Sequence, residues 1–112
     1  MGGVPHGSLD AQVSAGGDDG YWTNGINLFD ATSTSLPLGA SGNNHIFARW
    51  TGITIPSRAR IAVAYAQVYY NSGNAVDGNR IYFNDVASPA APTSYSEANG
   101  KALTTAYTTW NI

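Results

Sequence analysis

The chain has 112 residues, of which 43% are hydrophobic and only 11% are charged, and its net charge at neutral pH is −2. This length indicates one domain, the missing basic cluster disfavours nucleic acid as a partner, and no apolar run is long enough to span a membrane. The start, MGGVPHGS, has no secretory signal pattern. Without cysteine there are no disulfides, and the abundance of Thr, Tyr, Gly, Asn and Ser is typical of β-proteins.

The N-terminal part of the chain predicts little regular structure. Residues 1–16 are expected to form a flexible, glycine-containing arm, with one short strand at 11–14, ahead of a domain over residues 17–112. A second short strand is expected at 26–29. A long polar loop, interrupted by Pro37 and by glycines, should follow it.

The strongest strand signals lie in the middle of the chain. Residues 45–55 are rich in aromatic and β-branched side chains and end at Pro56, which cannot donate to a β-ladder. Residues 60–70 alternate from Ala62 onward, with small apolar side chains on one face and larger ones on the other. This alternation predicts a strand whose small face packs against a second sheet.

The C-terminal third predicts shorter elements. A strand at 80–84 should form a hairpin with 60–70 across a turn-rich loop, and a short helical turn is expected at 94–99. A threonine-rich strand is expected over 103–112. The pattern of about six short strands predicts an all-β fold, an antiparallel β-sandwich.

Several local motifs resemble a known class of domain. They are the Ile55-Pro56 pair after an aromatic strand, the run Ile61-Ala62-Val63-Ala64-Tyr65, the loop over 85–94 and a late threonine-rich strand that ends in Trp110. In this order they resemble the jelly-roll-type β-sandwich of phage virion proteins and secreted bacterial proteins, which is similar to carbohydrate-binding modules. The resemblance implies a jelly-roll-like fold and a virion or extracellular location. Such domains usually continue beyond the Trp strand, so we expect either a smaller sandwich or a partner subunit that completes it.

Aromatic side chains suggest a glycan platform. Tyr and Trp rings stack on sugars while their polar tips bind hydroxyl groups. Tyr21 and Trp22 are adjacent, so only one of them can be exposed on a strand; a core role competes with sugar contact. Tyr65, Gln67 and Tyr69 share one face of the expected strand at 60–70, which suits either a glycan groove or a subunit interface.

Metal binding and catalysis find weaker support. Asp18 and Asp19 could hold Ca²⁺, but their D-D-G spacing does not match an EF-hand loop, and a solvated turn is the simpler interpretation. For a paired-carboxylate glycosidase the candidates are Asp30, Asp85 and Glu97, of which the last two suit turns or caps better. We therefore expect no enzyme and no resident cofactor.

These observations favour a non-enzymatic virion structural protein, such as a capsid decoration, tail or fibre component. Subunits would exchange or dock the N-terminal arm and the terminal strand, with Leu103, Tyr107 and Trp110 as assembly residues. The partners would be further copies of the chain and other virion proteins. The alternative is a glycan-binding module or adhesin that recognises a cell-surface glycan.

Overall fold

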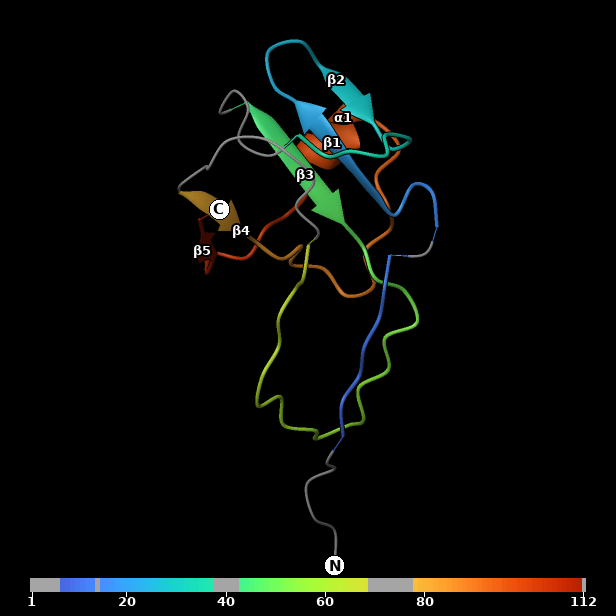
Figure 1. The fold of residues 1–112 in the computed structure, drawn as a ribbon, viewed down its shortest axis with the longest axis vertical. Coiled ribbons are helices and arrows are strands. Elements are labelled where there is room, and N and C mark those ends of the chain that lie inside the picture. Colours follow the sequence, from blue (N-terminus) through green and yellow to red (C-terminus); the bar gives the residue numbers. More distant parts are fainter. Residues whose placement is uncertain (1–6, 14, 38–42, 69–77, 112) are drawn as a thin grey trace, which may run out of the picture.

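The computed structural model of the chain describes residues 7–13, 15–37, 43–68 and 78–111. These residues form short strands and one short helix (Figure 1). In chain order the elements are β1 (Asp19–Thr23), β2 (Leu28–Asp30), β3 (Asn44–Ala48), β4 (Asn79–Ile81), α1 (Tyr95–Asn99) and β5 (Thr108–Trp110). They make two antiparallel sheets, β2-β1-β3 and β4-β5. The strand-rich, antiparallel character is as expected, and the sandwich arrangement stays a prediction.

Strand β1 is the centre of the larger sheet. It pairs with β2 in the register Tyr21↔Asp30 and with β3 in the register Tyr21↔Ile46. Gly20 makes this packing possible, because a Cβ there would lie 2.4 Å from the Asp30 carbonyl oxygen and 2.8 Å from the Phe47 ring. The two outer strands can therefore close around β1 only with glycine at this position.

One face of the larger sheet is aromatic. Trp22 stacks on His45 with ring centroids 4.9 Å apart, and Phe29 stacks on Phe47 at 5.9 Å. Helix α1 contacts β1 on this face, since the Trp22 indole Nε1 donates to Asn99 Oδ1 at 3.3 Å. Cross-strand aromatic stacking and the helix together hold this part of the molecule, the body.

Helix α1 confirms the helical turn expected at 94–99. Ser94 caps it in an extended conformation and accepts a hydrogen bond from the Glu97 backbone N–H at 3.2 Å. The Glu97 carboxylate reaches back to Thr93, accepting from its N–H at 2.8 Å. Ala98, only 3% exposed, is the buried side chain of the helix.

The smaller sheet corrects the expected hairpin between 60–70 and 80–84. Strand β4 pairs with β5 instead, in the register Arg80↔Thr109, and the pairing continues irregularly to a bridge between Asn84 and Leu103. The terminal strand is correspondingly shorter than expected and covers only Thr108–Trp110.

Several other expected strands are absent from the described residues. Residues 11–13 and 60–68 form no strand, and the strand expected over 45–55 ends with β3 at Ala48. The strand expected at 26–29 is shifted to Leu28–Asp30 because residues 24–27 form a turn. Position 14 and residues 69 and 70, also assigned to strands, lie outside the described residues.

Candidate functional site

The most unusual feature of the molecule is the extended loop, residues 50–68. It leaves the body after β3, reaches its tip in a turn and runs back, as Figure 1 shows in green and yellow. The turn is closed by a hydrogen bond from the Ala59 N–H to the Pro56 carbonyl at 3.0 Å. Arg58 sits in this turn at φ 66°, a left-handed conformation that glycine or asparagine adopts more easily.

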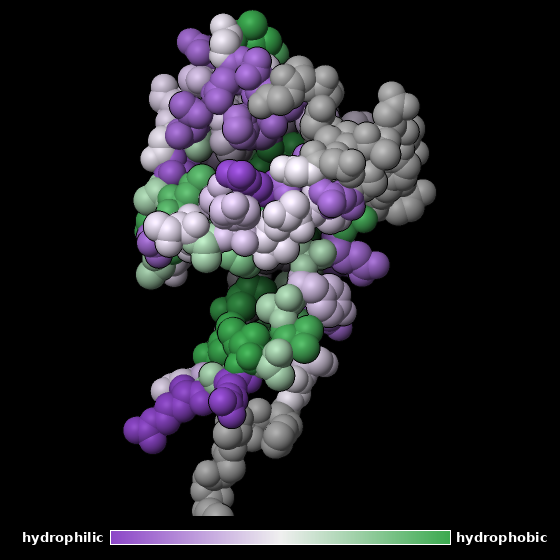
Figure 2. Space-filling view, turned by 90° about the vertical axis from the view of Figure 1, so that its left-hand side faces the viewer, coloured by the Kyte–Doolittle hydropathy of each residue, from purple (hydrophilic) through white to green (hydrophobic). Residues whose placement is uncertain are grey.

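The extended loop is apolar and uncovered. Seven of the fifteen exposed large hydrophobic side chains among the described residues lie on it, and Val63 and Tyr65 are 78% and 80% exposed. In the space-filling view apolar surface gathers in the lower half of the molecule (Figure 2). Clustered exposed apolar side chains of this kind mark interaction surfaces in soluble proteins. The seven are Trp50, Ile53, Ile55, Ile61, Val63, Tyr65 and Val68.

The backbone of the extended loop is also without partners in the described part of the chain. Neither residues 50–55 nor residues 60–68 form a backbone hydrogen bond with another described residue. Both segments nonetheless have strand-type sequences. Extended backbone with unpaired N–H and C=O groups is a template for pairing with another strand.

Arg49 anchors the base of the extended loop. Its Nη1 donates to Asp18 Oδ1 at 2.7 Å, its Nε donates to the Pro89 carbonyl at 2.8 Å, and its backbone N–H bonds the Asp18 carbonyl at 2.7 Å. Beside it lies an open hollow of about 320 Å³. The hollow is lined by Arg49, Trp50, Thr51, Gly52, Ile53, Ser88 and Pro89.

The outer edge of β3 is the second feature with unpaired backbone. The hydrogen bonds from Arg49 N–H to Asp18 and from Asn24 N–H to Asn43 show that odd-numbered residues of this segment bond β1. In an antiparallel pair the intervening residues direct their N–H and C=O groups to the other side. Asn44, Ile46 and Ala48 therefore point these groups outward, and no described strand pairs with that edge.

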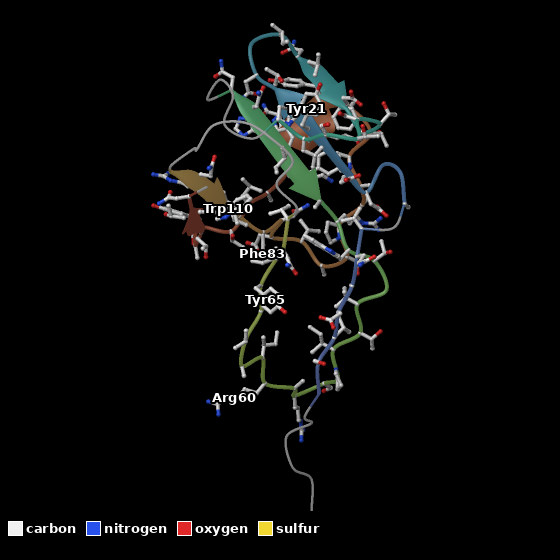
Figure 3. All side chains as sticks on the ribbon, in the orientation of Figure 1. Tyr21, Arg60, Tyr65, Phe83 and Trp110 are labelled. Atoms are coloured by element: carbon white, nitrogen blue, oxygen red, sulfur yellow. The ribbon has the colours of Figure 1, made fainter. Side chains whose placement is uncertain are left out.

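The two halves of the expected glycan platform lie apart. Figure 3 shows Tyr21 in the larger sheet and Tyr65 on the extended loop. Trp22 is half-buried, stacked on His45 and hydrogen-bonded to Asn99, so its ring is committed to the body. Tyr21, on the opposite face of β1, is half-buried as well.

The described residues that remain from the predicted glycan face are on the extended loop. Tyr65 and Gln67 are both exposed. Tyr69 lies outside the described residues. The structure thus offers an exposed tyrosine and a neighbouring amide, separate from Tyr21 and Trp22.

The candidate metal ligands differ from each other in environment. Asp18 is 7% exposed and paired with Arg49, which uses one of its carboxylate oxygens. Asp19 is half-buried at the start of β1, opposite Ala48. Among the described residues no group of three acidic or histidine side chains lies together as a metal site.

The expected assembly residues take part in contacts within the chain. Leu103 bridges Asn84, and Trp110 pairs with Asn79 in the smaller sheet. The Arg80 guanidinium lies 4.5 Å from the Tyr107 ring centroid. The pKa of Arg80 is raised, chiefly by a hydrogen bond with Tyr82 and then by the charge interaction with Tyr107. Leu103 and Tyr107 remain exposed and available to a neighbour.

Two further carboxylates, those of Asp30 and Glu97, serve local structure. Asp30 accepts hydrogen bonds from the backbone and hydroxyl of Thr32 at 2.7 and 2.9 Å, which lowers its pKa. Glu97 is likewise held by the Thr93 N–H and hydroxyl, and its pKa is lowered. These contacts are those of turn and cap residues, as expected for Glu97.

Arg49 and the β3 edge were not recognised from the sequence. Arg49 reads as one residue of a continuous strand over 45–55, and nothing in its neighbourhood signals that the strand ends there. The Asp18–Arg49 pair joins residues 31 positions apart. Only the fold brings these two groups together.

Comparison of the chain with protein-family models, with curated proteins and with solved structures gave no match. In the part of the chain that the structure describes, no helix has the length and apolar character needed to cross a bilayer. Function must therefore be argued from the geometry above and from the sequence motifs.

Proposed function

We propose that the chain is a non-enzymatic structural subunit that assembles with other subunits into a larger particle. The observation that carries this proposal is the extended loop, with its exposed apolar side chains and its backbone unpaired within the described residues. A loop of this composition would bury its side chains and pair its backbone by docking against another polypeptide.

The surface area of the whole chain supports assembly. The chain exposes 8825 Å², whereas a compact monomer of 11.7 kDa is expected to expose about 5,900 Å². The exposed apolar side chains of the extended loop are part of this excess, and an interface of standard size buries roughly 800 Å² on each partner. The radius of gyration, 15.7 Å, is likewise larger than the value of about 13 Å expected for this length.

The kind of particle is proposed from the sequence motifs. The resemblance to the β-sandwich of phage virion proteins favours a capsid decoration, tail or fibre component. The low charge of the chain agrees with this role, since the cores of subunit interfaces are depleted of charged residues. The proposed location is the virion or the extracellular space.

The proposal is tested by the solution mass of the purified chain. Light scattering behind a sizing column at two concentrations should show a mass several times 11.7 kDa that rises or persists with concentration. A chain that remains monomeric at both concentrations would contradict self-assembly.

Glycan binding is the second candidate function, and the exposure of Tyr65 favours it. A tyrosine ring that is 80% exposed beside an exposed Gln67 presents a stacking face and amide groups to solvent. The Tyr65→Ala variant should then lose the fluorescence response to a bound polysaccharide, while Tyr107→Ala, at an exposed tyrosine next to β5, should keep it. No response of the wild-type chain to a panel of polysaccharides would rule out this function.

A further inference from the structure

We infer that the partner of the extended loop is a second copy of this chain, and that residues 61–68 of one copy add as a strand to the outer edge of β3 in another. This inference rests on the proposed assembly role and specifies its partner and contact. Main-chain pairing of an extended segment with an open sheet edge is a common mode of protein association.

The donor segment has the properties of a strand in every respect except pairing. Residues 61–68 read IAVAYAQV, they alternate small and large side chains, and all eight are exposed. They form no backbone hydrogen bond with any described residue. Such a segment has backbone groups along both edges available to a partner.

The acceptor is the longest open edge of the larger sheet. On β3 three residues, Asn44, Ile46 and Ala48, direct their backbone groups outward by the register described above. On β2, the other edge, the same reasoning leaves only Phe29 outward, because Leu28 and Asp30 bond β1. An added strand therefore gains more hydrogen bonds along β3 than along β2.

Charge complementarity favours a second copy as the occupant. Arg58 and Arg60 are the only charged residues of the extended loop, so the loop carries +2. Since the net charge of the chain is −2, the remainder carries −4. Figure 3 places Arg60 near the tip of the loop, away from the sheet of its own copy. The loop of one copy is thus attracted to the remainder of another copy.

The absence of cysteine allows a direct test by disulfide trapping. The Ala48→Cys chain is mixed under oxidising conditions with single-cysteine chains carrying the change at one position from 62 to 66. In each mixture a mixed disulfide can form only between two copies. Residues paired across strands have Cα atoms about 5.5 Å apart, within the range for a disulfide.

We expect one position in the series to link most strongly and its immediate neighbours, which face the opposite side of the strand, to link least. Ala87→Cys is the matched control, because Ala87 is also exposed but lies in the loop before Pro89, and it should link at the background rate. Equal linking at every position, or linking no stronger than in the control, would overturn the inference.

A proline substitution separates this contact from assembly in general. Ala64→Pro removes a backbone N–H that has no partner in the described chain, so the body should keep its folded spectrum while the assembly loses mass. Ala87→Pro, at an exposed alanine outside the extended loop and the N-terminal arm whose N–H bonds no described residue, should leave the mass unchanged.

The outcomes are distinguishable. An Ala64→Pro chain that assembles like the wild type would overturn the strand pairing and leave the assembly role standing. A wild-type chain that is monomeric at both concentrations would overturn both proposals.

Discussion

The larger sheet and the extended loop are built from similar residues, but the side chains of the sheet are packed and those of the loop are exposed. Strand β3, with the sequence NHIFA, packs its Phe47 ring against Phe29. The same ring lies 6.4 Å from the Trp22 ring, with 36° between the two ring planes. The segment IAVAYAQV has an even clearer strand pattern, yet all its side chains are exposed. The comparison shows that β-propensity produces extended backbone, whereas burial requires a partner strand in reach.

Strand β3 has β1 as its pairing partner, whereas the extended loop has no partner strand among the described residues. Gly20 on β1 leaves room for the Phe47 ring, and the register places Trp22 against His45. Arg49 marks the boundary between the two regions, since its side chain is bonded to the body and the unpaired residues begin immediately after it.

The largest effect is expected for Gly20→Ala. The new Cβ would lie within 3 Å of backbone atoms of Asp30 and Ala31, so β2 must move away from β1. We expect a loss of about 3 kcal/mol in the free energy of unfolding, the upper range for overpacking, measured by urea titration followed by tryptophan fluorescence. Gly16→Ala is the control, because a Cβ there meets nothing within 4 Å, and it should unfold like the wild type.

The next effect tests the anchor of the extended loop. Arg49→Ala leaves the Asp18 carboxylate, only 7% exposed, without its cation. We expect a loss of about 2 kcal/mol in the free energy of unfolding, which is the usual contribution of a hydrogen bond to a charged group. Arg60→Ala, at an exposed arginine near the tip of the loop (Figure 3), should cost nothing measurable in the monomer. Equal losses in the two variants would contradict the separation of the two regions.

The sequence predicted local structure more successfully than pairing. The helical turn at 94–99 follows from the S-Y-S-E spacing, in which Ser94 caps and Glu97 reaches back, and it is observed. The hairpin between 60–70 and 80–84 is wrong, because β4 finds its partner in β5, beyond the helix. Which strands pair depends on contacts between distant residues, and a single sequence does not encode these in any local pattern.

At the candidate site, too, the sequence suggested residue types but not which residues lie together. Tyr21, Trp22, Tyr65 and Gln67 are each plausible sugar contacts by residue type. The structure commits Trp22 to a stack with His45 and leaves Tyr65 exposed on a different part of the molecule. The exposed backbone of the extended loop could not be expected, since its strand pattern itself predicted that it would be paired.

A smaller effect is expected at the helix that covers the aromatic face. Ser94→Ala removes the oxygen that accepts the Glu97 N–H, and the loss of an N-cap costs about 1 kcal/mol. Ser96→Ala, an exposed serine within the same helix, serves as the matched control and should change the unfolding free energy very little. Because α1 contacts β1, the Ser94→Ala change acts on the body, and the chain should also keep its assembled mass. A change in mass would show that the body and the loop are coupled.

The smallest expected effect is a dependence of body stability on acid. The hydrogen bonds from Thr93 lower the pKa of Glu97 from its ordinary value of 4.5, so this carboxylate binds its proton more readily in the unfolded chain. Its contribution to stability is fully present above pH 4.5 and is lost as the pH falls through the lowered pKa of the folded state. The difference in unfolding free energy between wild type and Glu97→Gln should therefore shrink below pH 4.5, in parallel urea titrations. The extended loop contains no carboxyl group, so a Glu97-dependent acid effect reports on the body alone, and a difference that stayed constant with pH would show that the Thr93 contact does not stabilise it.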